Sequence, residues 1–564
     1  MCKIQQTSAV SGASTVRMQG LDGRYTLLLR DGMPAFGGLS GGFDLLRIPP
    51  LDLQRVELLK GPSSTFNGGG AIAGAINFVS KAPTDSLSGL VLLNRASLGE
   101  TNVNIYASGP IGKTGFTLFG GSTLQDAVDV NKDGYSDLGT IRTNVLHPQV
   151  FIRPGAKSEL RIGGLYQHDE RTGGRMDALG APADTARYFL RTTGERKGID
   201  LRYEATLDST SKLVAKGTLN DYAQHDRTNL GRVQREQTNR YAEAYWSQSS
   251  ARRTWVFGGS YVGSRMNGDG MRAQDLSTVG AFAQLALHRK RWPEIDIGLR
   301  VDQPRGYDPQ VLPSIAAMYK LSSTVTLRAN AGTGYQLPDR SRNYGLVTEG
   351  VIASGLAPGT KPESSTGGTV EWTWKKALGE HTFLFVDQTF FATHIDHPLA
   401  VTMDGSGTAI LSNARGTMLT RGIDNYVRLK HGHAELYLGY TYTLPELRAG
   451  GNTSIVAYTP KHRAAMTLSR EFGEHWRAGV EASWSGRQAR TDGSLTRAQP
   501  FMAAMVSYAN GRWTLALNGE NITDTRQTRW EDIVSGTSSR PVFAPLWAPI
   551  DGRVINLSLL FRFG

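Results

Sequence analysis

Apolar and polar residues alternate along most of the chain, from about residue 86 to the C-terminus. In WRAGVEASW (476–484), every second residue is apolar, from Trp476 to Trp484, and TVTLRANA (324–331) and INLSLLFRF (555–563) show the same period of two. Successive side chains of a β-strand point to opposite faces, so this pattern predicts strands with one apolar and one polar face. About 22 such segments follow Pro83, an even number.

The spacing of tryptophans and the lengths of the connectors indicate a membrane. Trp476 and Trp484 share the apolar face of one segment, about 26 Å apart at ~3.3 Å per residue. At a tilt of roughly 40° this projects to about 20 Å, close to the ~25 Å apolar band of an outer-membrane barrel. Tight connectors such as GPIGKTG and RPGAKS alternate with long ones at 171–197 and 336–363. The sequence therefore predicts an all-β membrane protein, an antiparallel transmembrane β-barrel of about 22 strands.

The first part of the chain differs from the rest. Residues 1–85 are rich in glycine, with short strand-like pieces between loops such as DGMPAFGGLSGGF. We therefore predict two domains, an N-terminal domain at 1–85 and the barrel at 86–564.

Charge limits the kinds of binding partner that the sequence predicts, and cysteine content limits its disulfides. The formal net charge of +12 would suit nucleic acid, lipopolysaccharide phosphates or an anionic small ligand. The basic residues are dispersed and form no nucleic-acid motif, so no nucleic-acid partner is predicted. Cys2 is the only cysteine, which excludes an intrachain disulfide, and no apolar signal-peptide core follows it.

Two motifs resemble enzyme signatures but lack the required context. Gly68, Gly70 and Ala73 match the G-x-G-x-x-A spacing of a dinucleotide loop, yet AGAINFVS after them has the composition of a strand where a helix is needed. Ser40 in GGLSGG lacks the strand and helix that flank a nucleophile elbow. A soluble propeller enzyme would need a repeat of ~40 to 50 residues, and none is found. We predict no enzymatic activity.

One acidic segment, DVNKDGYSD, carries a metal hypothesis. Asp129, Asn131, Asp133 and Asp137 occupy positions one, three, five and nine of a calcium loop, where alternate oxygens converge on a hard cation. Thr140 stands at the twelfth position in place of the bidentate Glu, so the segment is not an EF-hand. A calcium-ordered extracellular loop and a solvated Asp/Asn/Gly turn both remain open. No other cofactor is expected.

Several segments together resemble one known family. VRMQGLDGRYTLLLRDGMPAFGG (16–38) and LQRVELLKGPSSTFNGGGAIAGAINFVSKAP (53–83) are similar to the plug domain of TonB-dependent outer-membrane receptors. GTGYQLPDRS, KPESSTGGTVEWTW, YTPKHR, GENITDTRQTRW and the terminal LLFRFG resemble that family's barrel landmarks in the right order. The resemblance covers essentially the whole chain. It implies a 22-stranded barrel in the cell outer membrane, filled by a plug, that imports a ferric siderophore or cobalamin with energy passed through TonB.

The resemblance also implies roles for residues of the N-terminal domain. Phe36, Gly37, Ser40 and Phe43 would lie in the apex loop of the plug and contact the ligand. Charged residues in positions like Arg17, Arg55 and Glu57 would pair with the barrel wall and hold the plug. The glycines Gly61, Gly68, Gly70 and Gly74 would allow tight turns and close packing inside the lumen.

The resemblance leaves other functions and partners to weigh. A non-transporting ligand-binding or signalling barrel and a plug-truncated passive pore of the same fold are the alternatives. The expected partners of a transporter are a metal chelate or corrinoid, outer-membrane lipid and lipopolysaccharide, and the TonB complex if a TonB box precedes Met1. We expect a monomer, and we expect that Met1 is not the true start of the protein.

Overall fold

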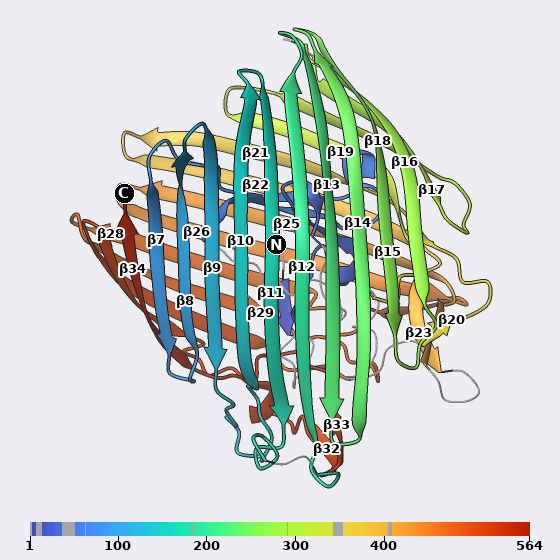
Figure 1. Cartoon of the computed structure of the whole chain (residues 1–564), viewed down its shortest axis with the longest axis vertical. Helices are drawn as coiled ribbons and strands as arrows, with labels where there is room; N and C mark the ends of the chain where they lie inside the picture. Colours follow the sequence, from blue (N-terminus) through green and yellow to red (C-terminus); the bar gives the residue numbers. More distant parts are fainter. Residues whose placement is uncertain are drawn as a thin grey trace.

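A closed antiparallel barrel encloses the N-terminal part of the chain (Figure 1). The computed structural model describes residues 3–6, 14–35, 51–62, 64–181, 184–289, 292–341, 354–403 and 409–564. The barrel has 22 strands and closes where the last strand pairs with the first, with Phe563 opposite Gly89. The predicted fold class and strand number are confirmed.

The barrel strands follow one another around the wall in chain order. They are β7 (Ser88–Ala96), β8 (Thr101–Ile111), β9 (Thr114–Gln125), β10 (Thr140–Gly155), β11 (Ser158–Gly174), β12 (Phe189–Thr206), β13 (Ser211–Thr228), β14 (Gly231–Ser249), β15 (Arg253–Gly268), β16 (Gln274–Leu287), β17 (Glu294–Pro304), β18 (Gln310–Lys320), β19 (Val325–Gln336), β21 (Glu363–Gly379), β22 (Thr382–Asp396), β25 (Thr417–His431), β26 (Ala434–Ala449), β28 (His462–Phe472), β29 (Trp476–Ser485), β30 (Gln499–Asn510), β31 (Trp513–Glu520) and β34 (Val554–Phe563).

The apolar face of each strand lies on the outside of the barrel. Trp476 and Trp484, at the two ends of β29, are 52% and 42% exposed. Polar side chains instead are buried on the lumen side, as Thr389 and Thr393 are on β22. A protein in water would hide such apolar side chains, whereas lipid covers them in a membrane barrel. Among the described residues, no helix is long and apolar enough to cross a membrane.

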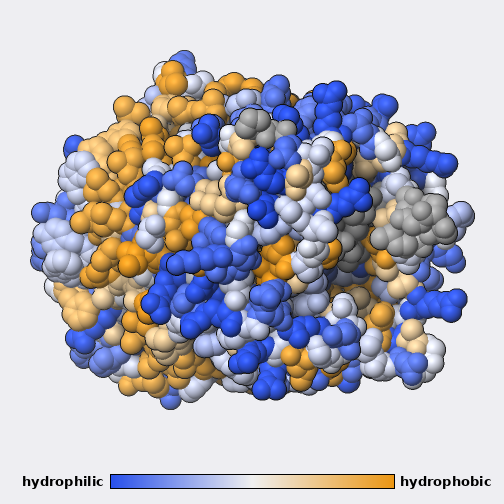
Figure 2. All heavy atoms as spheres, turned by 90° about the horizontal axis from the view of Figure 1, so that it is seen from below, coloured by the Kyte–Doolittle hydropathy of each residue, from blue (hydrophilic) through white to orange (hydrophobic). Residues whose placement is uncertain are grey.

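The connectors differ between the two ends of the barrel. Two-residue turns join β8 to β9, β10 to β11 and β30 to β31, whereas long segments at the other end join β19 to β21, β22 to β25 and β31 to β34. The long segments carry small sheets of their own, β20 (Gly355–Leu356) with β24 (Ala409–Asn413) and β23 (Leu399–Met403), and β32 (Val534–Thr537) with β33 (Arg540–Phe543); β27 (Asn452–Ile455) extends β26. Hydrophilic side chains gather over much of this loop-bearing end (Figure 2).

One predicted loop is shorter in the structure than in the sequence analysis. The prediction placed a loop at 171–197, but β11 continues to Gly174 and β12 begins at Phe189. The two strands pair without interruption from Gly174 opposite Phe189 down to Ser158 opposite Ala205, so backbone hydrogen bonds carry them past the membrane depth. The other predicted long loop, 336–363, agrees with the end of β19 at Gln336 and the start of β21 at Glu363.

The described part of the N-terminal domain lies inside the barrel and contains two small sheets (Figure 1). β1 (Lys3–Gln6) pairs with β2 (Ser14–Arg17), and a four-stranded sheet has the order β4 (Met33–Pro34), β3 (Thr26–Arg30), β6 (Gly74–Ser80), β5 (Leu53–Lys60). A single helical turn, α1 (Ser64–Asn67), and a 3-10 turn, η1 (Gly23–Tyr25), complete it. The predicted domain boundary falls between the end of β6 at Ser80 and the start of β7 at Ser88.

The apolar core of the N-terminal domain includes one residue from the barrel. Tyr25, Ile72 and Phe78 belong to a buried cluster that also contains Ile395 of β22, which is fully buried. An apolar side chain on the lumen face of β22 therefore contributes to the core of the enclosed domain. The domain and the wall pack as one unit.

The outward face of β29 provides a test of the membrane placement. Val480 lies midway between Trp476 and Trp484, so Val480→Arg should destabilise the folded protein by about 2–4 kcal/mol, the cost of a cation near the bilayer midplane. Ala478→Arg, on the same face and nearer the Trp476 end, should cost clearly less. Equilibrium unfolding in phospholipid vesicles measures both, and equal costs would contradict the placement.

Candidate functional site

A buried carboxylate joins the N-terminal domain to the barrel. Glu363, at the start of β21, is 0% exposed and accepts hydrogen bonds from Arg24 Nη2 at 3.2 Å and from the Tyr25 hydroxyl at 2.7 Å. The backbone N–H of Leu399, at the start of β23, donates to the same oxygen at 2.6 Å. One side chain therefore connects the enclosed domain, the barrel wall and a segment of the loop-bearing end.

Further ion pairs fix the other side of the domain. Asp31, in the turn after β3, lies 3.0 Å from Arg161 Nη1 on β11. Asp52 pairs with Arg30 of its own domain and lies 2.9 Å from His147 Nδ1 on β10. All of these side chains are buried or nearly so, which makes each pair costly to break from one side.

The contact at Lys60 is looser than the others. Lys60 Nζ lies 3.9 Å from Asp387 and 3.8 Å from Asp424, on β22 and β25, and its side chain is partly exposed. A cavity of about 310 Å³ lies beside it, lined by residues that include Leu58 and Tyr426. This sector of the interface is incompletely packed.

The structure pairs the predicted locking residues differently from the prediction. Arg17 does reach the barrel side, since its Nη1 donates to Thr459 Oγ1 at 2.9 Å, but its charge faces Asp22 of its own domain at 3.5 Å. Arg55 and Glu57 lie 2.7 Å from each other, exposed on β5. β5 is the last strand of the small sheet, and only Lys60 at its end reaches charges of the wall among the described residues of this strand. The closer pairs with the wall come from Arg24 and Asp31, which lie next to β3.

The glycine-rich segment packs against the barrel. Gly61, Gly68 and Gly74 have positive φ, and a Cβ at Gly74 would lie 2.1 Å from the carbonyl oxygen of Leu59. Gly70 borders a cavity, described below, and is not among the positive-φ residues.

The closest approach to the wall in this segment is at Gly69, in the middle of the glycine run 68–70. A Cβ at Gly69 would lie 2.2 Å from the Tyr335 ring. The Gly69 carbonyl also accepts a hydrogen bond from the backbone N–H of Tyr335 at 3.1 Å. The close contact with the end of β19 therefore requires a residue without a side chain at position 69, that is, glycine.

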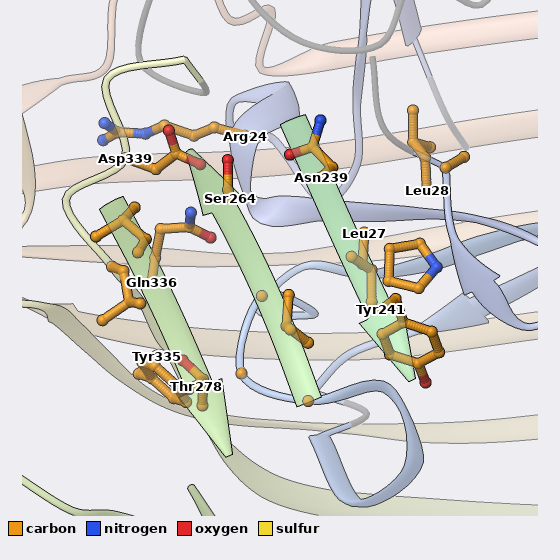
Figure 3. Close-up of a pocket in the computed structure, with 18 of the residues that line it drawn as sticks. Arg24, Leu27, Leu28, Asn239, Tyr241, Ser264, Thr278, Tyr335, Gln336 and Asp339 are labelled. Atoms are coloured by element: carbon orange, nitrogen blue, oxygen red, sulfur yellow. The ribbon is translucent and has the colours of Figure 1, made fainter. Parts of the chain in front are cut away.

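A cavity of about 200 Å³ separates the N-terminal domain from strands β14 to β17 and β19 (Figure 3). Leu27 and Leu28 of β3 border it on the domain side, and Asn239 and Tyr241 of β14 on the barrel side. Residues from the start of the long β19–β21 connector, among them Asp339, close it toward the loop-bearing end. It is thus a hollow between the domain and the wall, at the end where the long connectors lie.

The predicted apex-loop residues, Phe36, Gly37, Ser40 and Phe43, lie outside the described residues. Their ligand contacts stay a prediction. Ala35, the residue directly before that segment, lines the cavity.

The acidic segment 129–137 folds as a turn held by its own side chains. Asp129 accepts from the backbone N–H groups of Lys132 at 2.6 Å and Gly134 at 2.8 Å, and Asp137 from those of Val130 at 2.7 Å and Asn131 at 3.1 Å. In the part of the chain that the structure describes, no three His, Cys, Asp or Glu side chains are grouped to hold a metal.

The protonation of Asp137 follows from its surroundings. Burial raises the pKa of Asp137 to about 6, and the charges of Asp133 and Asp129 act in the same direction. The two backbone N–H bonds oppose this increase without cancelling it. Whether calcium binds here stays a prediction.

Comparison with known proteins identifies the family. Residues 103–522 match the family described as TonB dependent receptor-like, beta-barrel, and residues 2–75 match the TonB-dependent Receptor Plug Domain. The first match covers most of the chain, and the protein therefore belongs to the TonB-dependent receptors of the outer membrane. This family consists of receptors and transporters and not of enzymes.

Individual relatives are similar at low identity. The iron-regulated outer membrane virulence protein of Vibrio cholerae (El Tor) is 23% identical over 546 residues, which cover 89% of this chain and 80% of that protein. The vitamin B12 transporter BtuB of Photobacterium profundum is 21% identical over 494 residues, covering 86% and 77%. The crystal structure of the siderophore receptor PirA from Acinetobacter baumannii superposes with a TM-score of 0.76 at 16% identity, covering 100% of this chain and 94% of that one, which shows the shared fold.

The Glu363 contact predicts how firmly the plug is held. Glu363→Gln removes the counter-charge of buried Arg24 and should destabilise plug docking by about 3–5 kcal/mol, the usual cost of breaking a buried pair from one side. The control is Glu371→Gln, which breaks the more exposed Arg328 pair on the same strand and should cost about 0–1 kcal/mol. Urea-dependent protease cleavage of the plug in detergent measures both. Equal urea midpoints of plug cleavage for the two variants would show that Glu363 does not hold the plug in place.

The acidic turn should respond to pH. The pKa of Asp137 in the folded protein, about 6, lies above the ~3.9 of an Asp in the unfolded chain. The protonated Asp137 side chain therefore stabilises the folded turn fully below about pH 4, and this contribution is lost as the pH rises through about 6. Hydrogen exchange of residues 126–139, corrected for intrinsic rates, should show more opening at pH 7 than at pH 5, and Asp137→Asn should abolish the difference.

Calcium addition extends the same experiment. A bound cation favours the carboxylate, so calcium should protect the turn at pH 7, and chelation should reverse the effect. Unchanged exchange after calcium addition would argue against the metal hypothesis.

Proposed function

We propose that the protein imports a scarce metal-bearing nutrient, a ferric siderophore or cobalamin, across the outer membrane with energy supplied through TonB. The observation that carries the proposal is a plug held inside the barrel by buried ion pairs and a buried Asp–His contact, with a cavity between plug and wall near the loop-bearing end. A ligand in that cavity can pass inward only if the plug moves or unfolds. Movement against several buried pairs requires an energy source, which is what TonB supplies in this family.

The relatives support the choice of nutrient class. One is named as iron-regulated and another as a vitamin B12 transporter, and the similar solved structure is that of a siderophore receptor. Low identity leaves the individual ligand open between these classes. The alternatives are a receptor that binds without transporting and a passive pore.

Growth promotion tests the proposal directly. The gene, cloned with its genomic upstream sequence, is expressed in a receptor-deleted host limited for iron or cobalamin, in TonB-positive and TonB-negative backgrounds. Each culture receives a single nutrient: a ferric trihydroxamate, a ferric triscatecholate or cyanocobalamin. We expect growth on one nutrient that disappears without TonB. Growth that persists without TonB would indicate a passive pore, and no growth on any nutrient would indicate a barrel that binds without transporting.

A further inference from the structure

The walls of the plug–barrel cavity combine apolar side chains with polar side chains that are mostly uncharged. Carboxamide and hydroxyl side chains from β14, β15, β16 and β19 and from the β19–β21 connector surround the space, together with apolar side chains that would pack on a carbon skeleton (Figure 3). The uncharged polar ones on the barrel side are Gln237, Asn239, Tyr241, Ser260, Ser264, Thr278, Tyr335, Gln336 and Ser341. Amides and hydroxyls recognise other hydrogen-bonding groups and offer no countercharge.

The charged residues around the cavity have partners within the protein. Arg300 Nε lies 2.7 Å from Asp302 Oδ1, and Tyr335 donates to Asp302 Oδ2 at 3.0 Å. Arg24 pairs with Glu363. The described lining contains two arginines and two aspartates, so its formal charges sum to zero.

The fourth charged residue, Asp339, serves its own loop. Its Oδ1 accepts hydrogen bonds from the backbone N–H of Ser341 at 2.8 Å and from the Ser341 hydroxyl at 2.7 Å. The role of the Asp339 carboxylate is therefore to hold the loop. Both arginines of the described lining already pair with carboxylates of the protein, so neither is available as a countercharge for an anionic ligand.

Among the uncharged side chains that line the cavity, two carry buried polar atoms with no hydrogen-bond partner within the described residues. They are Thr26 Oγ1 on plug strand β3 and Asn239 Oδ1 on barrel strand β14. The residues are 6% and 1% exposed. An unpaired buried polar atom costs about 1–3 kcal/mol, so both positions favour a bound group that completes their hydrogen bonds. An oxygen such as Asn239 Oδ1 accepts, and its missing partner is therefore a donor, an N–H or O–H.

We propose that this cavity takes an electrically neutral part of the imported chelate or corrinoid that carries amide or hydroxyl groups, with Thr26 and Asn239 as specificity residues, and that it discriminates against polyanionic chelates. The inference rests on the proposed import function and specifies its substrate class. A polyanion buried here would lose its hydration without gaining a free countercharge from the described lining. A neutral ligand satisfies both unpaired atoms at once, one on the plug and one on the wall.

Binding to the purified full chain in detergent tests the inference with three probes. These are a neutral ferric trihydroxamate, cyanocobalamin and a ferric triscatecholate of net charge about −3, followed by tryptophan fluorescence. We expect one neutral probe to bind at least ~10-fold more tightly than the triscatecholate. Thr26→Val and Asn239→Leu should each weaken that neutral probe by roughly 10-fold, the effect of one lost buried hydrogen bond.

Thr393→Val is the matched control. Thr393 Oγ1 is also buried without a hydrogen-bond partner among the described residues, but it lies on β22 and does not line the cavity. This variant should bind every probe like the parent. Heat-modifiable gel mobility verifies that each variant retains the folded barrel.

The outcomes separate this inference from the import function. Tighter binding of the triscatecholate, or unchanged affinities in Thr26→Val and Asn239→Leu, would overturn the inference; the second result would mean that the cavity holds water only. TonB-dependent growth on the triscatecholate alone would refute the neutral substrate class while leaving import intact. If none of the probes binds and none supports growth, both proposals fail.

Discussion

The polar inner wall of the closed barrel is the constraint on which the rest of the structure depends. A closed sheet satisfies all of its backbone hydrogen bonds between neighbouring strands. Because side chains alternate along each strand, one face of the sheet lies in lipid and the other faces the lumen. Polar side chains buried against an enclosed domain need partners on that domain. The plug provides these partners, since Arg24 and Tyr25 contact Glu363 and Asp31 contacts Arg161. In the other direction, Ile395 of the wall is part of the buried apolar cluster of the plug.

The same contacts suit a plug that has to be held and later moved. A buried ion pair adds little net stability over an apolar contact, because the desolvation of both charges offsets most of their attraction. It is nevertheless specific, since a shifted plug would leave a buried charge unpaired. Pairs of this kind fix one position of the plug without making it very stable there. The longer ion-pair distances and the cavity at Lys60 show that the contacts between plug and wall are not equally tight around the barrel.

The sequence predicted those features that depend on local pattern. The period of two along 476–484 and the two tryptophans are enough to assign strand, orientation and membrane depth, because side-chain alternation is a property of a single strand. The glycines Gly61, Gly68 and Gly74, expected at tight turns from the family resemblance, do have positive φ. The locking residues were not, because Arg24 and Glu363 are 339 positions apart and nothing local shows which charge faces which strand. A usable signal existed, since Arg24 on one side and the adjacent charged residues Arg30 and Asp31 on the other flank the apolar run at 27–29.

Charge and hydrogen bonding divide the lumen between two tasks. The buried charges of the plug are paired with the wall, and where charges border the cavity they are paired within the protein as well. Besides apolar side chains, the cavity presents amides and hydroxyls, and two atoms of these groups lack a hydrogen-bond partner among the described residues. If a ligand carried the charge instead, it would compete for the residues that position the plug and would loosen the plug on binding. A neutral ligand avoids that competition, so binding and plug retention can be selected independently, and the ligand gains its specificity from groups that do not hold the plug.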